Sequence, residues 1–153
     1  MASTTARAIG KHRRSTPASV RPADFRAALE AALADADADE RIGPLIRATK
    51  LRLRFEFTDS DMALNLAAGA GDRNLTWSFA DEPGWAPKLE LEMGSGVANR
   101  YLQGRESLAI AIARGQVRVS GESRTALLYL PAARLLCEPY RRVVEADFPT
   151  LAV

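Results

Sequence analysis

Residues 93–130 decide the fold; they read MGSGVANRYLQGRESLAIAIARGQVRVSGESRTALLYL. Residues 97–103 have the spacing of an amphipathic helix, and Gly104 follows them, where a helix end favours a residue that tolerates left-handed backbone geometry. Residues 108–114 repeat this arrangement and end at Gly115. The first half of the stretch therefore predicts two short helices.

A strand and a further helix complete this stretch. Residues 116–120 alternate apolar and polar side chains with a period of two, which is typical of a half-buried strand, and Gly121 ends it. Helical spacing returns at residues 125–130. The order predicted for the whole stretch is helix, helix, strand, helix.

Upstream, the sequence predicts one helix and four strands. Residues 22–35 form a helix with one apolar stripe, made of Phe25, Ala28, Leu29, Ala32 and Leu33. Residues 50–58 alternate polar and apolar side chains without error, which is the strongest strand signal in the chain. The other predicted strands are residues 62–67, 73–79 and 88–93, with a hairpin loop at 69–72 and a longer crossing connection at 81–87.

Prolines predict interruptions of the chain. We expect Gly43-Pro44 to break the chain, with Leu45 and Ile46 returning to the core. Pro131 and Pro139 are expected to divide the C-terminal region into short helices.

Charges suggest which strands are neighbours. The outward positions of the first strand are mostly basic and those of the fourth strand include Glu90 and Glu92, and opposite charges favour pairing of adjacent strands. We therefore expect these two strands to lie side by side on a solvated face. Arg54→Glu should then destabilise only mildly, whereas Phe55→Asp should unfold the domain.

These elements predict an α+β fold, with a single five-stranded, mostly antiparallel sheet and helices covering its apolar face. The composition, 47% hydrophobic and 26% charged over 153 residues, fits one soluble globular domain at residues 22–153. Residues 1–21 are expected to be a disordered basic tail, because residues 1–22 hold five basic side chains and no acidic one. The rest of the chain has 16 basic and 19 acidic side chains, so no nucleic-acid partner is expected.

No secretory signal or membrane span is predicted, and at most weak peripheral contact with an anionic membrane is expected. Cys137 is the only cysteine, so a disulfide framework is excluded and a cytoplasmic location is expected. The sequence does not predict an oligomeric state.

The chain resembles the sterol carrier protein type two (SCP2) sterol-binding domain superfamily over about residues 22–145. The similarity rests on glycines and aliphatic residues at Gly104, Ala113-Arg114-Gly115, Val117, Val119, Gly121 and Ala126-Leu127. The sequence departs from the family pattern at residues 94–98, GSGVA, where an acid is often found at the start of the helix, and it has no peroxisomal tail. This departure sets it apart from the eukaryotic sterol-transfer type and favours a bacterial type.

The resemblance implies an apolar tunnel between sheet and helices that holds a sterol, fatty acyl chain or similar lipid. The residues expected to face this tunnel are Phe55, Phe57, Trp77, Phe79, Leu91, Met93, Val97, Tyr101, Leu108, Ile112, Leu128, Leu135 and Leu136. Every one of them could equally belong to an ordinary filled core, because periodicity identifies a face and not a void.

Residues for most kinds of catalysis are absent from the predicted domain. The sole histidine, His12, lies in the tail, so Cys137 has no histidine partner there, and no acidic cluster has metal-ligand spacing. No cofactor or metal is therefore expected. Three functions remain open: a non-enzymatic lipid carrier, a scaffold with a filled core, and a small cyclase-like or dehydratase-like biosynthetic enzyme. The enzyme would use carboxylates and tyrosines in the tunnel, for which the candidates are Asp61, Tyr101, Glu138 and Tyr140.

Overall fold

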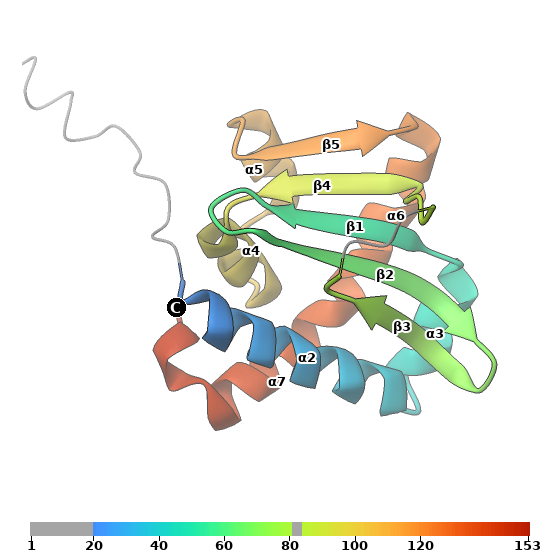
Figure 1. Cartoon of the computed structure of the whole chain (residues 1–153), viewed down its shortest axis with the longest axis horizontal. Coiled ribbons are helices and arrows are strands. Elements are labelled where there is room, and N and C mark those ends of the chain that lie inside the picture. Colours follow the sequence, from blue (N-terminus) through green and yellow to red (C-terminus); the bar gives the residue numbers. More distant parts are fainter. Residues whose placement is uncertain (1–19, 81–83) are drawn as a thin grey trace, which may run out of the picture.

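The computed structural model describes residues 20–80 and 84–153. Residues 1–19 of the predicted tail and 81–83 of the crossing connection lie outside this part of the chain. One mixed sheet organises the described residues (Figure 1). Its strands are β1 (Arg52–Phe57), β2 (Met62–Ala70), β3 (Arg73–Ser78), β4 (Leu89–Met93) and β5 (Val117–Gly121).

The strand order is β3-β2-β1-β4-β5, and every neighbouring pair is antiparallel except β1 and β4, which are parallel. The predicted neighbourhood of these two strands is confirmed. Arg54 and Glu90 are register partners, and their charged groups lie 3.7 Å apart. The predicted α+β class with a mostly antiparallel sheet is likewise confirmed.

Six α-helices and two short 3-10 helices accompany the sheet in the described residues. They are α2 (Pro22–Ala38), α3 (Ile42–Thr49), α4 (Ser95–Leu102), α5 (Leu108–Ala113), α6 (Ser123–Ala133), η1 (Arg134–Leu136), α7 (Cys137–Asp147) and η2 (Pro149–Leu151). The polar positions of β1 and β4 are half-buried and the apolar positions are fully buried. The helices therefore cover the predicted apolar face.

The core is centred on the contact of α2 with the sheet and with α7. All five residues of the predicted α2 stripe are buried. The Phe25 ring meets Phe57 of β1 edge to face, with ring centroids 5.0 Å apart, and Tyr140 of α7 in the same way at 6.3 Å. The second contact joins α2 to a residue more than 100 positions later in the chain.

The predicted break at Gly43-Pro44 is wrong, because both residues lie in the first turn of α3. Proline is tolerated there, since an N–H group of the first turn has no helical partner. The Asp39 carboxylate accepts hydrogen bonds from the N–H groups of Arg41 and Ile42, at 2.8 and 2.9 Å, and so supports the start of the helix. Ile46 is buried as expected, but Leu45 is 53% exposed.

The prediction that Pro131 and Pro139 divide the C-terminal region is wrong in both positions, since Pro139 lies in the first turn of α7. Pro131 lies inside α6, and the chain is divided instead at η1, before α7. The missing N–H of Pro131 would have bonded to the carbonyl of Leu127, and Leu127 is 77% exposed, so solvent can replace that bond. The hairpin loop is also shorter than predicted, because β2 continues through Ala70.

The acid absent from the start of α4 in sequence is supplied from elsewhere in space. Asp59, in the turn after β1, accepts hydrogen bonds from the Ser95 N–H at 2.9 Å and from the Ser95 hydroxyl at 2.8 Å. A carboxylate at this position complements the positive end of the helix dipole. A carboxylate therefore lies at the start of α4 although residues 94–98 contain no acid.

Candidate ligand-binding site

A small apolar cavity of about 20 Å³ lies between the sheet and helices α2, α4 and α7. It is lined by Leu29, Ala32, Leu33, Phe55, Phe57, Leu64, Ala98, Tyr101, Leu102, Leu136 and Tyr140. Its volume is about what one water molecule needs, and its lining offers water few polar partners. A lipid could enter only if the surrounding side chains moved apart.

A groove of about 950 Å³ lies outside this cavity, bordered by the end of α4, α5, α6, η1 and α7. Its lining is Tyr101, Gly104, Arg105, Glu106, Ser107, Leu108, Ala109, Ile112, Leu130, Pro131, Arg134, Cys137, Glu138 and Arg141. Tyr101 lines both hollows, so the two hollows adjoin at this residue. The space is thus divided into two hollows, where the resemblance implies one tunnel.

The Tyr101 hydroxyl is the exceptional polar group of this wall. Tyr101 is only 5% exposed, and its hydroxyl makes no well-formed hydrogen bond among the described residues. Its polar neighbour is the Cys137 thiol, which is a weak hydrogen-bonding group. Burial raises the pKa of Tyr101, so this phenol stays protonated at neutral pH. An unpaired buried hydroxyl costs about 1 to 3 kcal/mol, so the fold carries an unmet hydrogen-bonding group at the boundary of the two hollows.

Tyr140 lines the inner cavity too, but its hydroxyl is satisfied. It donates to Asn99 Oδ1 at 2.6 Å, and Gln103 Nε2 donates to the same oxygen at 2.8 Å. Asn99 and Gln103 also donate to the Leu151 carbonyl, at 2.9 and 2.8 Å, which ties the end of the chain to α4. Our sequence reasoning missed this network. The sequence feature that could have predicted it is the pair of amide side chains, Asn99 and Gln103, spaced four positions apart at α4.

Cys137 lies beside Tyr101, and its thiol donates to the Tyr101 carbonyl at 3.6 Å. Burial raises the pKa of Cys137, and the nearby guanidinium groups of Arg134 and Arg141 oppose this effect only in part. The thiol is therefore protonated at neutral pH and is a poor nucleophile.

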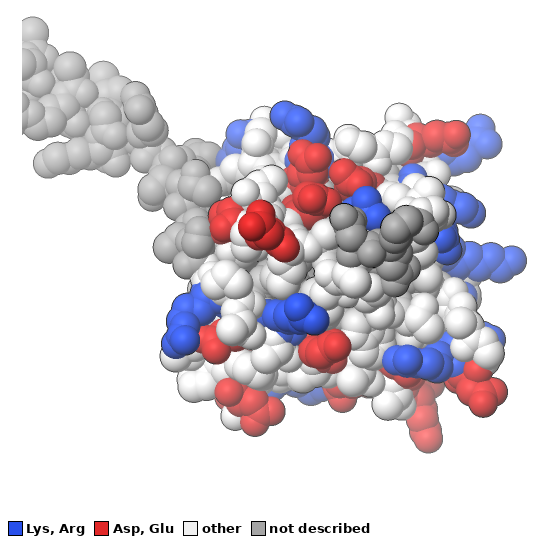
Figure 2. Space-filling view, viewed as in Figure 1, with Lys and Arg blue, Asp and Glu red and all other residues white. Residues whose placement is uncertain are grey.

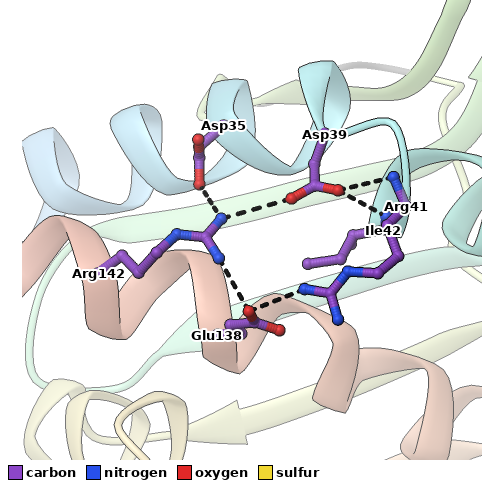
Figure 3. A network of polar contacts seen from close by, with 6 residues as sticks. All are labelled: Asp35, Asp39, Arg41, Ile42, Glu138 and Arg142. Atoms are coloured by element: carbon purple, nitrogen blue, oxygen red, sulfur yellow. Dashed lines mark hydrogen bonds and ion pairs between the residues drawn. The ribbon is translucent and has the colours of Figure 1, made fainter.

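The four residues of the enzyme hypothesis do not form one catalytic group. Tyr101 and Tyr140 share the inner cavity, but Asp61 is exposed in the turn between β1 and β2. Glu138 borders the outer groove and binds Arg41 at 2.9 Å and Arg142 at 3.0 Å, as part of a surface network with α2 (Figure 3). The inner cavity has no acid in its lining, so the hypothesis lacks its acid–base carboxylate.

The residues expected to face ligand are divided between several places. Phe55, Phe57, Tyr101 and Leu136 line the inner cavity, and Leu108 and Ile112 line the groove with Tyr101. Leu91, Met93 and Val97 are buried in the core without lining either hollow, and Leu135 is half-buried at its edge. Sequence reasoning missed the contribution of α2, which supplies three lining residues, because a helix stripe does not indicate which of its members adjoin a void.

Three of the expected residues lie elsewhere. Trp77 donates its indole N–H to Glu30 of α2 at 2.8 Å, and Phe79 lies under the Arg26 guanidinium at 4.8 Å. Leu128 is 66% exposed, so the expectation that it points inward is wrong. The inward residues of α6 are Tyr129, Ala132 and Ala133, and Leu128 is turned away from that side by the 3.6-residue period.

No group of three or more His, Cys, Asp or Glu side chains within residues 20–80 and 84–153 is placed to hold a metal ion. None of the helices in these two ranges has both the length and the apolar character needed to cross a bilayer.

Comparisons with known proteins give similarity in structure only. No family profile matches the sequence, and no curated protein matches it. A possible sterol carrier protein from Thermus thermophilus superposes with a TM-score of 0.58 at 16% identity, covering 85% of this chain and 95% of that one. Sterol carrier protein domain 2 of Helicoverpa armigera gives 0.56 at 15% identity, covering 79% and 95%.

Two further solved structures extend this picture. The ubiquinone synthesis protein UbiJ-SCP2 gives a TM-score of 0.54 at 17% identity, covering 75% of this chain and 96% of that one. The chain also matches part of the sec-alkylsulfatase Pisa1 from a Pseudomonas species, with a TM-score of 0.50 at 15% identity. That match covers 65% of this chain but only 15% of the sulfatase. The described residues thus have the SCP2-like fold.

Proposed function

We propose that this protein reversibly binds a small hydrophobic ligand, without transforming it, in the outer groove and past Tyr101 into the inner cavity. The SCP2-like fold supports this proposal, since solved structures that share it are named as sterol carrier proteins. The single observation that carries it is the buried Tyr101 hydroxyl, which has only the weak Cys137 thiol beside it and lines both hollows.

A ligand at this place would relieve two costs of the free protein. Its polar atom could pair with the Tyr101 hydroxyl, and its apolar part could fill space that protein atoms leave empty. A ligand that displaced the Tyr101 side chain would lie against both hollows, because Tyr101 lines each of them. The apolar surface it buries would supply about 25 cal/mol per Å² toward binding.

The packing of α6 fits the role of a movable cover. Only Tyr129, Ala132 and Ala133 of its eleven residues are fully buried. The Tyr129 hydroxyl donates to the Lys50 carbonyl at 3.2 Å, which is the one side-chain hydrogen bond that the described part of the chain gives this helix. An element with few buried contacts opens at low free-energy cost, so this side of the groove can admit a ligand while α2, α7 and the sheet stay in place.

The proposal is tested by filling the groove. Ala109 is an exposed groove residue of α5, and Ala113 is exposed on the same helix outside the groove lining. Ala109→Trp should weaken the affinity for a fluorescent acyl probe at least tenfold, and Ala113→Trp should leave this affinity unchanged. Circular dichroism checks that both variants fold, and native mass spectrometry of fresh protein identifies any co-purified lipid. Absence of a co-purified lipid together with absence of acyl or sterol binding at micromolar concentration would contradict the proposal.

A further inference from the structure

The outer groove carries an unbalanced charge. Arg105, Arg134 and Arg141 line it, and none of their side chains makes an ion pair or hydrogen bond within the described residues. Elsewhere in the described chain arginines are mostly paired with acids; the paired ones are Arg21, Arg41, Arg54, Arg73, Arg100, Arg114, Arg118 and Arg142. On the face seen in Figure 2, basic and acidic side chains are correspondingly interspersed.

The acids of the groove do not neutralise these arginines. Glu106 lies 3.7 Å from Arg100 and 4.0 Å from Arg114. Glu138 is shared by Arg41 and Arg142, on the side of α7 that faces α2 (Figure 3). The four arginines that pair with Glu106 and Glu138 all lie outside the groove lining. Both acids are therefore paired with arginines outside the groove, and the three arginines of the groove remain unpaired.

The three arginines come from different elements but act on one region. Arg105 follows Gly104, and Arg141 of α7 reaches the same place, because a Cβ added to Gly104 would lie 3.7 Å from its Nη1 atom. The guanidinium groups of Arg134, from η1, and Arg141 partly oppose the rise in the pKa of the Cys137 thiol, and Arg134 does the same for the pKa of Tyr101. The positive charge therefore lies in the groove that Tyr101 shares with the inner cavity.

Another part of the groove wall is apolar. Leu108, Ala109 and Ile112 contribute from α5, and Leu130 and Pro131 from α6. Unpaired guanidinium groups beside an apolar wall match a molecule with one anionic end and one apolar chain. A free inorganic anion would leave the apolar wall exposed, and a neutral sterol or alcohol would leave the arginines unpaired.

We propose that the ligand is a single-chain amphiphile with an anionic carboxylate or phosphate head group, held by Arg105, Arg134 and Arg141 while its chain lies along the apolar wall of the groove. This inference rests on the proposed function, because it specifies the ligand of the same site. Each charge-assisted hydrogen bond from a guanidinium contributes about 1.5 to 3 kcal/mol, so removing one arginine should weaken anion binding by about 10- to 100-fold.

The test compares dodecanoate, dodecanol and inorganic phosphate as competitors of a fluorescent acyl probe at pH 7 and low salt. We expect dodecanoate to bind at least tenfold more tightly than dodecanol, raised salt to reduce that preference, and phosphate alone to compete weakly. Arg134→Gln and Arg141→Gln should remove the preference and leave dodecanol binding unchanged. Arg124→Gln is the matched control, because Arg124 is an exposed, unpaired arginine of the described α6 outside the groove lining.

The outcomes separate the two proposals. Equal binding of the acid and the alcohol, insensitive to salt and to the arginine variants, would overturn the anionic head group and leave hydrophobic binding intact. Phosphate competing as strongly as dodecanoate would indicate a plain anion site and overturn the amphiphile. Binding of none of the three, nor of the probe, would refute the proposed function itself. Arg134 and Arg141 are both exposed, and the salt titration of the unmodified protein gives a readout that does not depend on any variant.

Discussion

The same substitution, tyrosine to phenylalanine, should have opposite effects at two buried positions of one cavity. Tyr101 and Tyr140 both line the inner hollow and are 5% and 1% exposed. The Tyr140 hydroxyl donates to Asn99 Oδ1 at 2.6 Å, whereas the Tyr101 hydroxyl has only the weak Cys137 thiol beside it and makes no well-formed hydrogen bond among the described residues. Each variant removes one oxygen atom and leaves the aromatic ring in place.

The magnitudes follow from these partners. Tyr140→Phe removes a buried hydrogen bond, but Asn99 Oδ1 still accepts from Gln103, so the loss should be about 1 to 2 kcal/mol. Tyr101→Phe removes an unsatisfied buried polar group, and the variant should be more stable than the unmodified protein by about 1 kcal/mol. The two variants should therefore differ by about 2 to 3 kcal/mol in their free energy of unfolding.

Urea denaturation followed by circular dichroism measures this difference directly. For a domain of this size it corresponds to roughly 6 to 12 °C in the thermal midpoint. Equal destabilisation by both substitutions would refute the reasoning, because it would mean that the Tyr101 hydroxyl is also satisfied in the folded protein. The proposed function adds a second expectation, that Tyr101→Phe gains stability but loses affinity for a ligand with a polar head.

Three further perturbations test the fold. Arg54 is not the exposed residue that the sequence suggests, since its side chain is 20% exposed and donates to Asn65 Oδ1 at 2.8 Å. Arg54→Glu should therefore lower the free energy of unfolding by about 1 to 3 kcal/mol in urea denaturation, and Phe55→Asp should unfold the domain. An unchanged midpoint for either variant would contradict the assigned faces of the sheet. Deleting residues 1–19, which show no apolar periodicity, should leave the thermal midpoint nearly unchanged, and a fall of many degrees would show that they pack on the domain. Hydrogen bonds from the N–H groups of Ile42 and Arg41 lower the pKa of Asp39 in the folded protein. Its stabilising effect is therefore present above its unfolded pKa of 3.8 and is lost as the pH falls through the lower folded value. Asp39→Asn should flatten the acid side of the curve of stability against pH, and an unchanged curve would contradict this.

The parts of the fold that the sequence predicted are those with a strict local period. The α2 stripe and the alternation of β1 both appear with the expected faces, because burial of one face requires that period. The helix α3 was missed because a Gly-Pro pair is compatible both with a turn that breaks the chain and with the first turn of a helix. What distinguishes the two is the Asp39 carboxylate and the close approach of Gly43 to Asn74, where a side chain would collide.

The site was less predictable than the fold, for a physical reason. Periodicity identified the faces that meet, and four of the residues named from it, Phe55, Phe57, Tyr101 and Leu136, line the inner cavity. It does not show which polar groups find partners across the fold. The difference between Tyr101 and Tyr140, and that between paired and unpaired arginines, both arise from contacts between residues tens of positions apart.

The central claim, that a ligand binds at the junction of the groove and the inner cavity, is tested most directly by intermolecular nuclear Overhauser effects in a complex with dodecanoate. We expect contacts from the chain of the ligand to the Ile112 and Leu108 methyl groups and to the Tyr101 ring, and none to Leu75 on the far strand β3. Contacts confined to the exposed Leu127 and Leu128 side chains, or none at all at saturating dodecanoate, would contradict the claim.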